Sequence, residues 1–497
     1  MATVAVFALS AIVAPADATE KTLRVGLYAF PPGMGNPFSQ TNLPAILVWP
    51  AVMEPLTVTQ PDGSIGPLLA VSWESVDKRT WRFELRRDVW FSNGEPFDAE
   101  AVVATFDWLK TDAARTMMMS SEMANIAGAR ALGSHLVEIT THEPDAMLPR
   151  ALSVLRIVPP RYWSETGPAG FARMPVGTGS FIVKEWGRTR IVMQANPDSW
   201  RPPRLDRIEF FELPETPARL QGMQSGALDI ALRFSPDDAP ALESVGARLI
   251  ASPTGSVYGI SFITNRASPL DDRRVRLALN MAVDREQIVR ELFHGTTEIA
   301  TQHVSRFAFG YAPELEPYPY DPEAARKLLR EAGYPDGFRF VAQVVVGALA
   351  NDSLVFQQIA ASLREIGVTL ELHVMPTQIL LRNIFTAEWR GHAFGMDYGA
   401  SPFLDGWRPF RMHSCLWPQP WFCDESLTPL ILEVRHEFDL ERRADLMKQL
   451  LAAYQEAAPA LMVYEGRSYD AVAGHVRHYQ NAFGVINFHR IEVATGR

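Results

Sequence analysis

The sequence predicts an α/β fold of more than one domain, and three observations support this prediction. The chain has 497 residues, of which 47% are hydrophobic. Because a single hydrophobic core stops growing near roughly 250–300 residues, at least two domains are expected. Helical and strand patterns alternate over residues 320–374, which predicts a sheet with helices on its faces. An apolar strand at 257–265 (VYGISFITN) is the predicted point where the chain first leaves the first domain.

After residue 20 the sequence predicts a buried strand followed by a loop. Residues 23–27 (LRVGL) have the composition of such a strand, and residues 29–38 (AFPPGMGNPF) form a loop rich in proline and glycine. A loop that leaves the end of a strand can line a cleft. Further along, residues 136–140 predict a short alternating strand and residues 144–155 a helix.

One longer stretch, residues 81–102 (WRFELRRDVWFSNGEPFDAEAV), combines a strand, a turn and a helix. Apolar and charged residues alternate from Trp81 to Leu85, as in a half-buried strand. Gly94 predicts a tight turn, because glycine tolerates positive φ. Asp98 predicts the N-cap of a helix whose apolar residues recur at helical spacing.

The second half of the chain continues the pattern with capped helices. Asp271 and Asp284 predict the N-caps of two helices within 269–289. Asp321 predicts a third cap, with Pro322 at the first helical position. Strands are predicted at 339–346, 368–374 and 461–465, and helices at 353–366 and 440–454.

Residues 81–102 resemble the signature of the extracytoplasmic solute-binding proteins, family 5, which serve peptide and nickel ABC importers. That signature typically runs W-x-F-x-L-R-x-x-V-x-F-x-[ND]-G-x-P-F-x-A-x-D-V, and every fixed position matches except the aspartate, where this chain has Ala101. Other segments resemble the same family and extend the resemblance over nearly the whole mature chain: 54–56, 68–74, 175–181, 196–211, 224–230, 269–289 and 320–338. The segment 175–181 (PVGTGSF) lacks the third glycine and the lysine of nucleotide-binding loops, so a crossover turn is the better interpretation.

The resemblance implies a type II periplasmic binding protein-like fold, with two α/β lobes joined by a hinge and an extra subdomain inserted in lobe I. The implied divisions are a signal peptide at 1–18, lobe I at 19–55, 176–265 and 475–497, the inserted subdomain at 56–175, and lobe II at 266–474. It also implies a function. The protein is expected to capture a peptide or peptide-like solute by closing its lobes, and to deliver it to the permease subunits of an ABC importer in the inner membrane.

Composition and the N-terminus predict a periplasmic location. Residues 1–18 form an apolar run that ends in Ala-Asp-Ala and resembles a secretory signal, although the basic n-region is missing and a buried N-terminal strand is the alternative. No cysteine lies directly after the predicted cleavage site, which argues against a lipid anchor. The net charge of -10 argues against nucleic acid or an anionic membrane as partner. We expect a monomer without a cofactor.

Cys415 and Cys423 are the two cysteines of the chain, and their short spacing in an exported protein predicts a disulfide, with two reduced structural cysteines as the alternative. No metal site is predicted: the spacing does not fit a zinc knuckle. His475 and His478 are better interpreted as part of a loop near the hinge. No motif brings together a nucleophile, a base and an orienting group, so catalysis is not expected, and a secreted hydrolase is the less favoured alternative.

Residues 395–402 (GMDYGASP) resemble a cleft loop of the family, W-x-x-D-Y-x-D-P, whose aspartate often contacts the ammonium group of a peptide. The loop 347–352, where dipeptide-binding members carry an arginine, has none here, which makes a longer peptide or another solute more plausible. The residues predicted to bind the ligand are Met34, Tyr258, Asp397, Tyr398, Ser401 and Trp407. A sugar or opine-type solute is one alternative; a nickel or metal-chelate ligand is another, with His373, His392 and His413 as candidates.

Overall fold

A ten-stranded mixed sheet runs through the whole molecule and joins its two lobes. The computed structural model describes residues 20–40 and 43–494, so the predicted signal peptide at 1–18 lies outside the described residues. In spatial order the strands of the sheet are β14 (Val368–Val374), β13 (Phe338–Val344), β15 (Ala393–Gly399), β12 (Arg248–Phe262), β16 (Ala460–Val472), β11 (Ile230–Ala231), β1 (Thr22–Leu27), β10 (Arg207–Glu212), β9 (Arg190–Ala195) and β8 (Phe181–Trp186).

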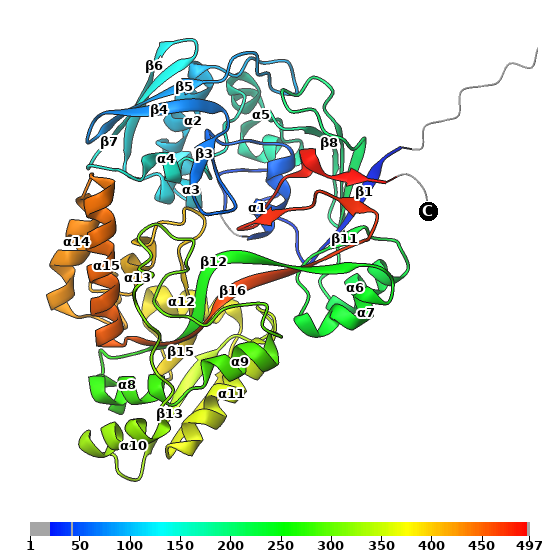
Figure 1. The fold of residues 1–497 in the computed structure, drawn as a ribbon. Coiled ribbons are helices and arrows are strands. Elements are labelled where there is room, and N and C mark those ends of the chain that lie inside the picture. Colours follow the sequence, from blue (N-terminus) through cyan, green and yellow to red (C-terminus); the bar gives the residue numbers. More distant parts are fainter. Residues whose placement is uncertain (1–19, 41–42, 495–497) are drawn as a thin grey trace, which may run out of the picture.

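The two long strands β12 and β16 connect the lobes (Figure 1). The first part of β12, Arg248 to Pro253, pairs antiparallel with the end of β16 on the lobe I side. Beyond a register shift between Pro253 and Val257, the second part of β12 pairs with β15 of lobe II. Each strand therefore belongs to both lobes, and the pair forms the hinge. The predicted lobe boundaries at residues 265 and 474 lie just beyond the ends of these strands.

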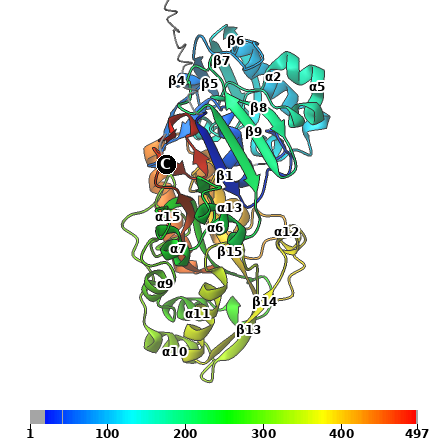
Figure 2. The ribbon, with the colours of Figure 1, turned by 90° about the vertical axis from the view of Figure 1, so that its right-hand side faces the viewer.

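Lobe I carries a separate four-stranded antiparallel sheet in the order β4 (Ala70–Asp77), β5 (Thr80–Leu85), β7 (Leu136–Thr141) and β6 (Ile126–Gly133). In Figure 1 it forms the blue and cyan region at the upper left, with helix α2 (Ala99–Leu109) beside it. The remaining elements of this part of lobe I are α1 (Leu43–Val48), β2 (Thr57–Thr59), β3 (Ile65–Pro67), α3 (Met118–Glu122), α4 (Leu148–Ala151) and α5 (Pro160–Arg173). Figure 2 shows this sheet and β8–β9 at one end of an elongated molecule, with β13 and β14 at the other.

The strand–turn–helix unit predicted at 81–102 is present. Gly94 has a φ of 86° in the turn, and the Asp98 carboxylate accepts the backbone N–H of Ala101 at 3.1 Å as the N-cap of α2. The buried Glu95 carboxylate accepts the backbone N–H groups of Arg161 and Tyr162, at 2.9 and 3.0 Å, in the first turn of α5. The turn thus fixes α5 as well as α2, since it satisfies donors that a helix start leaves free.

Three of the segments that resemble the family meet at the buried carboxylate of Glu54. Its Oε2 accepts the Thr178 hydroxyl at 2.7 Å and the Trp200 indole N–H at 2.8 Å, and its Oε1 accepts the Arg201 guanidinium. The turn at 175–181 packs directly on the backbone before Glu54: a Cβ on Gly177 would lie 2.0 Å from the carbonyl oxygen of Val52. This close approach requires glycine there. The segment is thus a structural crossover turn.

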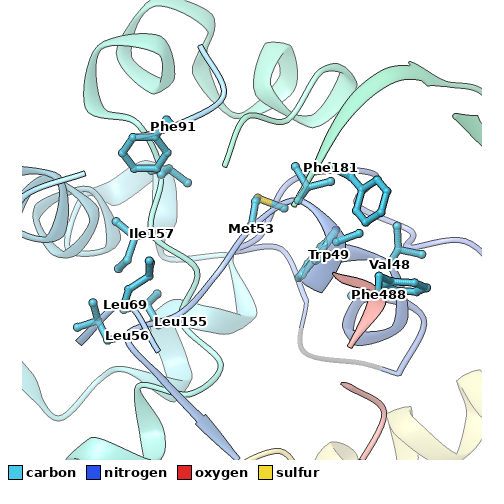
Figure 3. Packing of buried hydrophobic residues seen from close by; sticks show 14 of the residues in the cluster. Val48, Trp49, Met53, Leu56, Leu69, Phe91, Leu155, Ile157, Phe181 and Phe488 are labelled. Carbon is cyan, nitrogen blue, oxygen red and sulfur yellow. The ribbon is translucent and has the colours of Figure 1, made fainter. Parts of the chain in front are cut away.

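The core around Glu54 joins the main sheet to the inserted subdomain. Figure 3 shows Met53 between two groups of buried side chains, with Trp49, Phe181 and Phe488 on one side and Leu155 on the other. Phe488 belongs to the C-terminal tail, which returns to lobe I through the small strands β17 (Val476–Arg477), β18 (Asn481–Ala482), β19 (Val485–Ile486) and β20 (Glu492–Val493). Lobe I also includes α6 (Thr216–Gln224) and α7 (Ala239–Glu243).

Lobe II packs helices around β13–β15: α8 (Arg273–Met281), α9 (Arg285–Leu292), α10 (Pro322–Glu331), α11 (Asp352–Glu365), α12 (Thr377–Thr386), α13 (Arg408–Met412), α14 (Thr428–His436) and α15 (Leu440–Ala457). Asp284 and Asp321 are N-caps as predicted. The cap of α8 is Asp272 and not Asp271, because residues 269–271 form a 3-10 turn of their own, capped by Ser268. The disulfide between Cys415 and Cys423 is confirmed. Among the described residues, none of the helices has the length and apolar character needed to cross a bilayer.

Candidate ligand-binding site between the lobes

Two adjoining cavities have Tyr258, Ala348 and Leu349 as common walls. One lies between the lobes, and the other is lined by lobe II and the hinge strands. The large chamber has a volume of about 320 Å³, and the small chamber about 240 Å³. Tyr258 comes from the hinge strand β12, while Ala348 and Leu349 belong to the lobe II loop that precedes α11. Concave sites of this size between two lobes are typical of ligand-binding sites.

The large chamber takes its walls from lobe I, the hinge and lobe II. Tyr28 and Phe234 contribute aromatic surface from lobe I, Tyr469 from the hinge strand β16, and Ser401 a hydroxyl from lobe II. Aromatic walls offer a ligand apolar surface with few polar groups. The charged side chains that line this chamber are Arg233, Arg408 and Arg467.

Asp397 lies at the wall of the small chamber. In β15 it is the cross-strand neighbour of Tyr258, and it is part-exposed, without a salt bridge among the described residues. Burial raises the pKa of the Asp397 carboxyl, and the Ser256 hydroxyl and the Arg408 guanidinium oppose that rise. A carboxylate in such surroundings is stabilised by a cation that enters the chamber.

Asp352, the other acidic residue of the small chamber, is already engaged by the protein. Its carboxylate accepts the backbone N–H groups of Gly347, Ala348 and Leu349 at 3.0, 2.9 and 3.0 Å. It therefore holds the loop 347–351 in the shape that forms the wall of both chambers. Asp352 has a structural role, and Asp397 is the carboxylate available to a ligand.

Both sides of the cleft carry direct contacts between the lobes. On one side, the Arg233 guanidinium of lobe I donates to the carbonyl of Gly347 at 3.0 Å, and the Asn351 amide donates to Asp237 at 3.1 Å. On the other side, Arg435 of lobe II pairs with Glu143 of the inserted subdomain at 2.7 Å. The lobes are therefore in direct contact on both sides of the cleft in this structure.

The six residues predicted from the sequence are distributed over different places. Tyr258, Asp397 and Ser401 line the chambers, and the Ser401 hydroxyl donates to the carbonyl of Thr254 at 2.5 Å. Tyr398 does not line them: successive strand residues face opposite sides of the sheet, so Tyr398 is 1% exposed and stacks on His413 with ring centroids 3.6 Å apart.

Trp407 and Met34 also lie outside both chambers. Trp407 lines a third cavity of about 220 Å³ between lobe II and the inserted subdomain, and its indole N–H donates to the carbonyl of Ile431 at 2.9 Å. Met34 has a φ of 53°, and its carbonyl accepts the Trp49 indole N–H at 3.0 Å. Its loop therefore folds onto the core of lobe I, and Met34 is absent from the lining of both chambers.

The histidines considered for a metal ligand lie elsewhere. His413 is buried against Tyr398, and burial lowers its pKa well below the usual range. His392 accepts the backbone N–H of Val341 at 3.2 Å, and His373 is exposed. Within residues 20–40 and 43–494, no group of three or more His, Cys, Asp or Glu side chains is placed to hold a metal ion.

The arginines of the large chamber were missed in the sequence, because they come from three separate segments. Arg233 follows β11, Arg408 begins α13, and Arg467 lies in β16. The resemblance to the family drew attention to the loop 347–352, where an arginine was looked for and this chain has none. Only the three-dimensional convergence of the hinge with both lobes brings these cations together.

Two α/β lobes, joined by shared strands and with a cavity between them, define the class of two-lobed solute-binding proteins. The sequence profile of the bacterial extracellular solute-binding proteins, family 5 (middle region), matches residues 64–412. The chain belongs to this family.

Similar proteins agree with this assignment. The chain is 26% identical over 521 residues to the "Probable di/tripeptide-binding protein 5" of Pseudomonas aeruginosa, with 96% of each chain covered. Among solved structures it is similar to NikA from Brucella suis in complex with Fe(III)-EDTA, with a TM-score of 0.80, 22% identity, and coverage of 95% of this chain and 100% of that chain. It is also similar to a dipeptide-binding protein from Pseudoalteromonas in complex with Met-Leu, with a TM-score of 0.78, 19% identity, and the same coverage.

Proposed function

We propose that the protein is the periplasmic substrate-binding component of an ABC importer. It captures a peptide or peptide-like solute between its lobes and delivers it, chemically unchanged, to a permease in the inner membrane. It acts as a monomer, without nucleic acid or cofactor. Its membership of family 5 supports the transport role, and the similarity to the di/tripeptide-binding protein supports a peptide ligand.

The observation that carries the proposal is Asp397, a part-exposed carboxylate with no ion-pair partner among the described residues, at the wall of the small chamber that adjoins the interlobe cavity. The ammonium group at the N-terminus of a peptide would supply the missing charge. The aromatic side chains of Tyr258 and Tyr464 line the same chamber and would enclose the residue that follows. A ligand that extends from Asp397 of lobe II into the large chamber, which lobe I also lines, contacts both lobes and therefore favours closure.

The first test is the substitution Asp397→Asn, which keeps the shape of the side chain and removes its charge. Because hydrogen bonds to charged groups contribute ~1.5–3 kcal/mol, the affinity for peptides with a free N-terminus should fall about 10- to 100-fold. Isothermal titration calorimetry measures this, using the di- and tripeptides that raise the melting temperature of the wild type most. The control is Asp445→Asn, which alters an exposed aspartate on α15. Equal affinity in the wild type and Asp397→Asn would remove Asp397 from the site.

The pH dependence of binding gives an independent test. Burial raises the pKa of Asp397 in the ligand-free protein, and a cationic ligand stabilises the ionised carboxylate, so binding releases a proton. The affinity should therefore rise as the pH increases through this raised pKa, and fall as the pH decreases below it. Titrations between pH 4 and pH 8, a range chosen to span about four units around a raised carboxyl pKa, should show this slope in the wild type. They should show no such slope in Asp397→Asn, nor with N-acetylated peptides.

A further inference from the structure

The two chambers of the cleft carry opposite charges. The large chamber is lined by three arginines, and its lining includes no aspartate or glutamate. The small chamber is lined by Asp352 and Asp397, and its lining includes no arginine or lysine. The chambers meet at Tyr258, so the site is positive on one side of this residue and negative on the other.

The three arginines differ in how far the protein already satisfies them. Arg408 pairs with Glu122 at 3.2 Å and donates to the carbonyl of Gly399. Arg233 donates to two carbonyl groups of the loop 347–351 and lies over the ring of Tyr28, 4.3 Å from its centroid. These contacts orient Arg233 but leave its charge without a carboxylate partner among the described residues.

Arg467 is the arginine that lacks partners. Within the part of the chain that the structure describes, its guanidinium has neither an ion pair nor a hydrogen bond, and its Nε is buried without an acceptor. Burying a guanidinium N–H without an acceptor costs free energy. Two N–H donors of a guanidinium match the two oxygens of a carboxylate, and because the Arg467 Nε is buried, its terminal Nη groups are the donors left for a ligand.

We infer that Arg467, assisted by Arg233, forms an anion subsite that binds a carboxylate group of the ligand in the large chamber. The inference rests on the proposed function and makes it more specific. The ligand is a zwitterion, with its ammonium group at Asp397 and its carboxylate at Arg467. The hinge strand β16 therefore contributes directly to ligand selection.

The spacing of the two charged positions limits the length of the ligand. Tyr258 is the cross-strand neighbour of both Asp397 and Tyr464, and Arg467 lies three residues beyond Tyr464 in β16. Asp397 and Tyr464 are two strand spacings apart, about 10 Å across the sheet, and the three residues from Tyr464 to Arg467 add about 10 Å along β16. The backbones of Asp397 and Arg467 are therefore about 14 Å apart. An extended peptide advances up to about 3.6 Å per residue, so a ligand of up to about four residues fits this distance.

The test compares three sets of probes: di- and tripeptides with free termini, the same peptides with an amidated C-terminus, and N-(carboxyalkyl) amino acids, which are opine-like and not peptides. Melting temperatures and calorimetry are measured for the wild type, Arg467→Gln and Arg467→Lys. The control is Arg188→Gln, which removes an exposed arginine in the turn between β8 and β9. In the wild type, amidation should weaken binding at least tenfold. Arg467→Gln should weaken binding of the free peptides by the same factor, and amidation should then cause no further loss of affinity. The affinity of Arg467→Lys for the free peptides should lie between those of the wild type and Arg467→Gln.

Unliganded Arg467→Gln should melt at or above the temperature of the wild type, because a part-exposed cation without a partner, whose Nε is buried and has no acceptor, does not stabilise the fold. A large loss of melting temperature would assign Arg467 a structural role and overturn the subsite. Undiminished discrimination against amidated peptides in Arg467→Gln would overturn it too.

A third result is possible: the opine-like probes bind, their binding is lost in Arg467→Gln, and no peptide binds. This result would support the anion subsite and contradict the proposal of a peptide ligand. If no carboxylate-bearing probe binds the wild type, both fall.

Discussion

Replacing Glu54 with alanine is expected to lower the free energy of unfolding by about 3–5 kcal/mol, which is the usual cost of removing one partner of a buried ion pair. Glu54 is 2% exposed and accepts hydrogen bonds from Thr178, Trp200 and Arg201. Without it, the half-buried Arg201 guanidinium and Trp200 indole N–H lose their acceptor. Urea denaturation followed by tryptophan fluorescence measures the change.

Two further variants separate the charge of Glu54 from its shape. Glu54→Gln keeps one acceptor and should lose less stability than Glu54→Ala. Glu492→Ala breaks the pair with Arg204, whose side chain is 56% exposed, and should cost less than about 1 kcal/mol. Similar losses for Glu54→Ala and Glu492→Ala would mean that the buried network adds nothing beyond a surface ion pair.

Substituting Arg443 with methionine is expected to have an effect of the same size, about 3–5 kcal/mol, and also to weaken ligand binding. The Arg443 side chain is 3% exposed and pairs with Asp405 at 3.0 Å. It also donates to the carbonyl groups of Val434 and Arg435, near the end of α14. Its loss leaves a buried carboxylate and two carbonyl groups unsatisfied.

The effect on binding follows from the position of Asp405. Its carboxylate also accepts the backbone N–H of Trp407 at 3.1 Å, so the ion pair fixes the loop that places Ser401 and Arg408 at the large chamber. The neighbouring Arg442, which is 65% exposed and pairs with Glu433 and Glu437, offers a matched control. Arg442→Met should change neither stability nor affinity appreciably. If Arg443→Met lost stability but kept its affinity, the loop held by Asp405 would not contribute to ligand binding.

Local sequence patterns predicted many elements of the fold, but the helix predicted at 144–155 is only α4 (Leu148–Ala151), and the strand predicted at 461–465 is the much longer β16 (Ala460–Val472). Turns and helix caps depend on residues that are close in sequence, so they can be predicted from it. This applies to the turn at Gly94 and to the caps at Asp98, Asp284 and Asp321. The cap at Asp272 was missed because a 3-10 turn and a helix start compete over the same few residues. The disulfide could be predicted because the chain has two cysteines.

The site was predicted less completely, because it is built from distant segments. Asp397 and Ser401 could be found by resemblance to a known cleft loop, but the strand alternation that turns Tyr398 into the core depends on the register with β12. Arg233 and Arg467 are 234 positions apart by their residue numbers, and no local pattern marks either of them. Their convergence follows from the pairing of β11, β12 and β16 in one sheet.

The contacts that bridge the lobes have a consequence for how tightly the protein holds its ligand. The pair between Arg435 and Glu143 and the bond from Arg233 to Gly347 favour the closed form whatever occupies the chambers. The apparent dissociation constant equals the intrinsic constant divided by the fraction of molecules that are competent to bind. Substitutions at the Arg435–Glu143 pair can therefore tune retention and release of cargo by shifting the balance between two populations, without altering any group that faces the cargo.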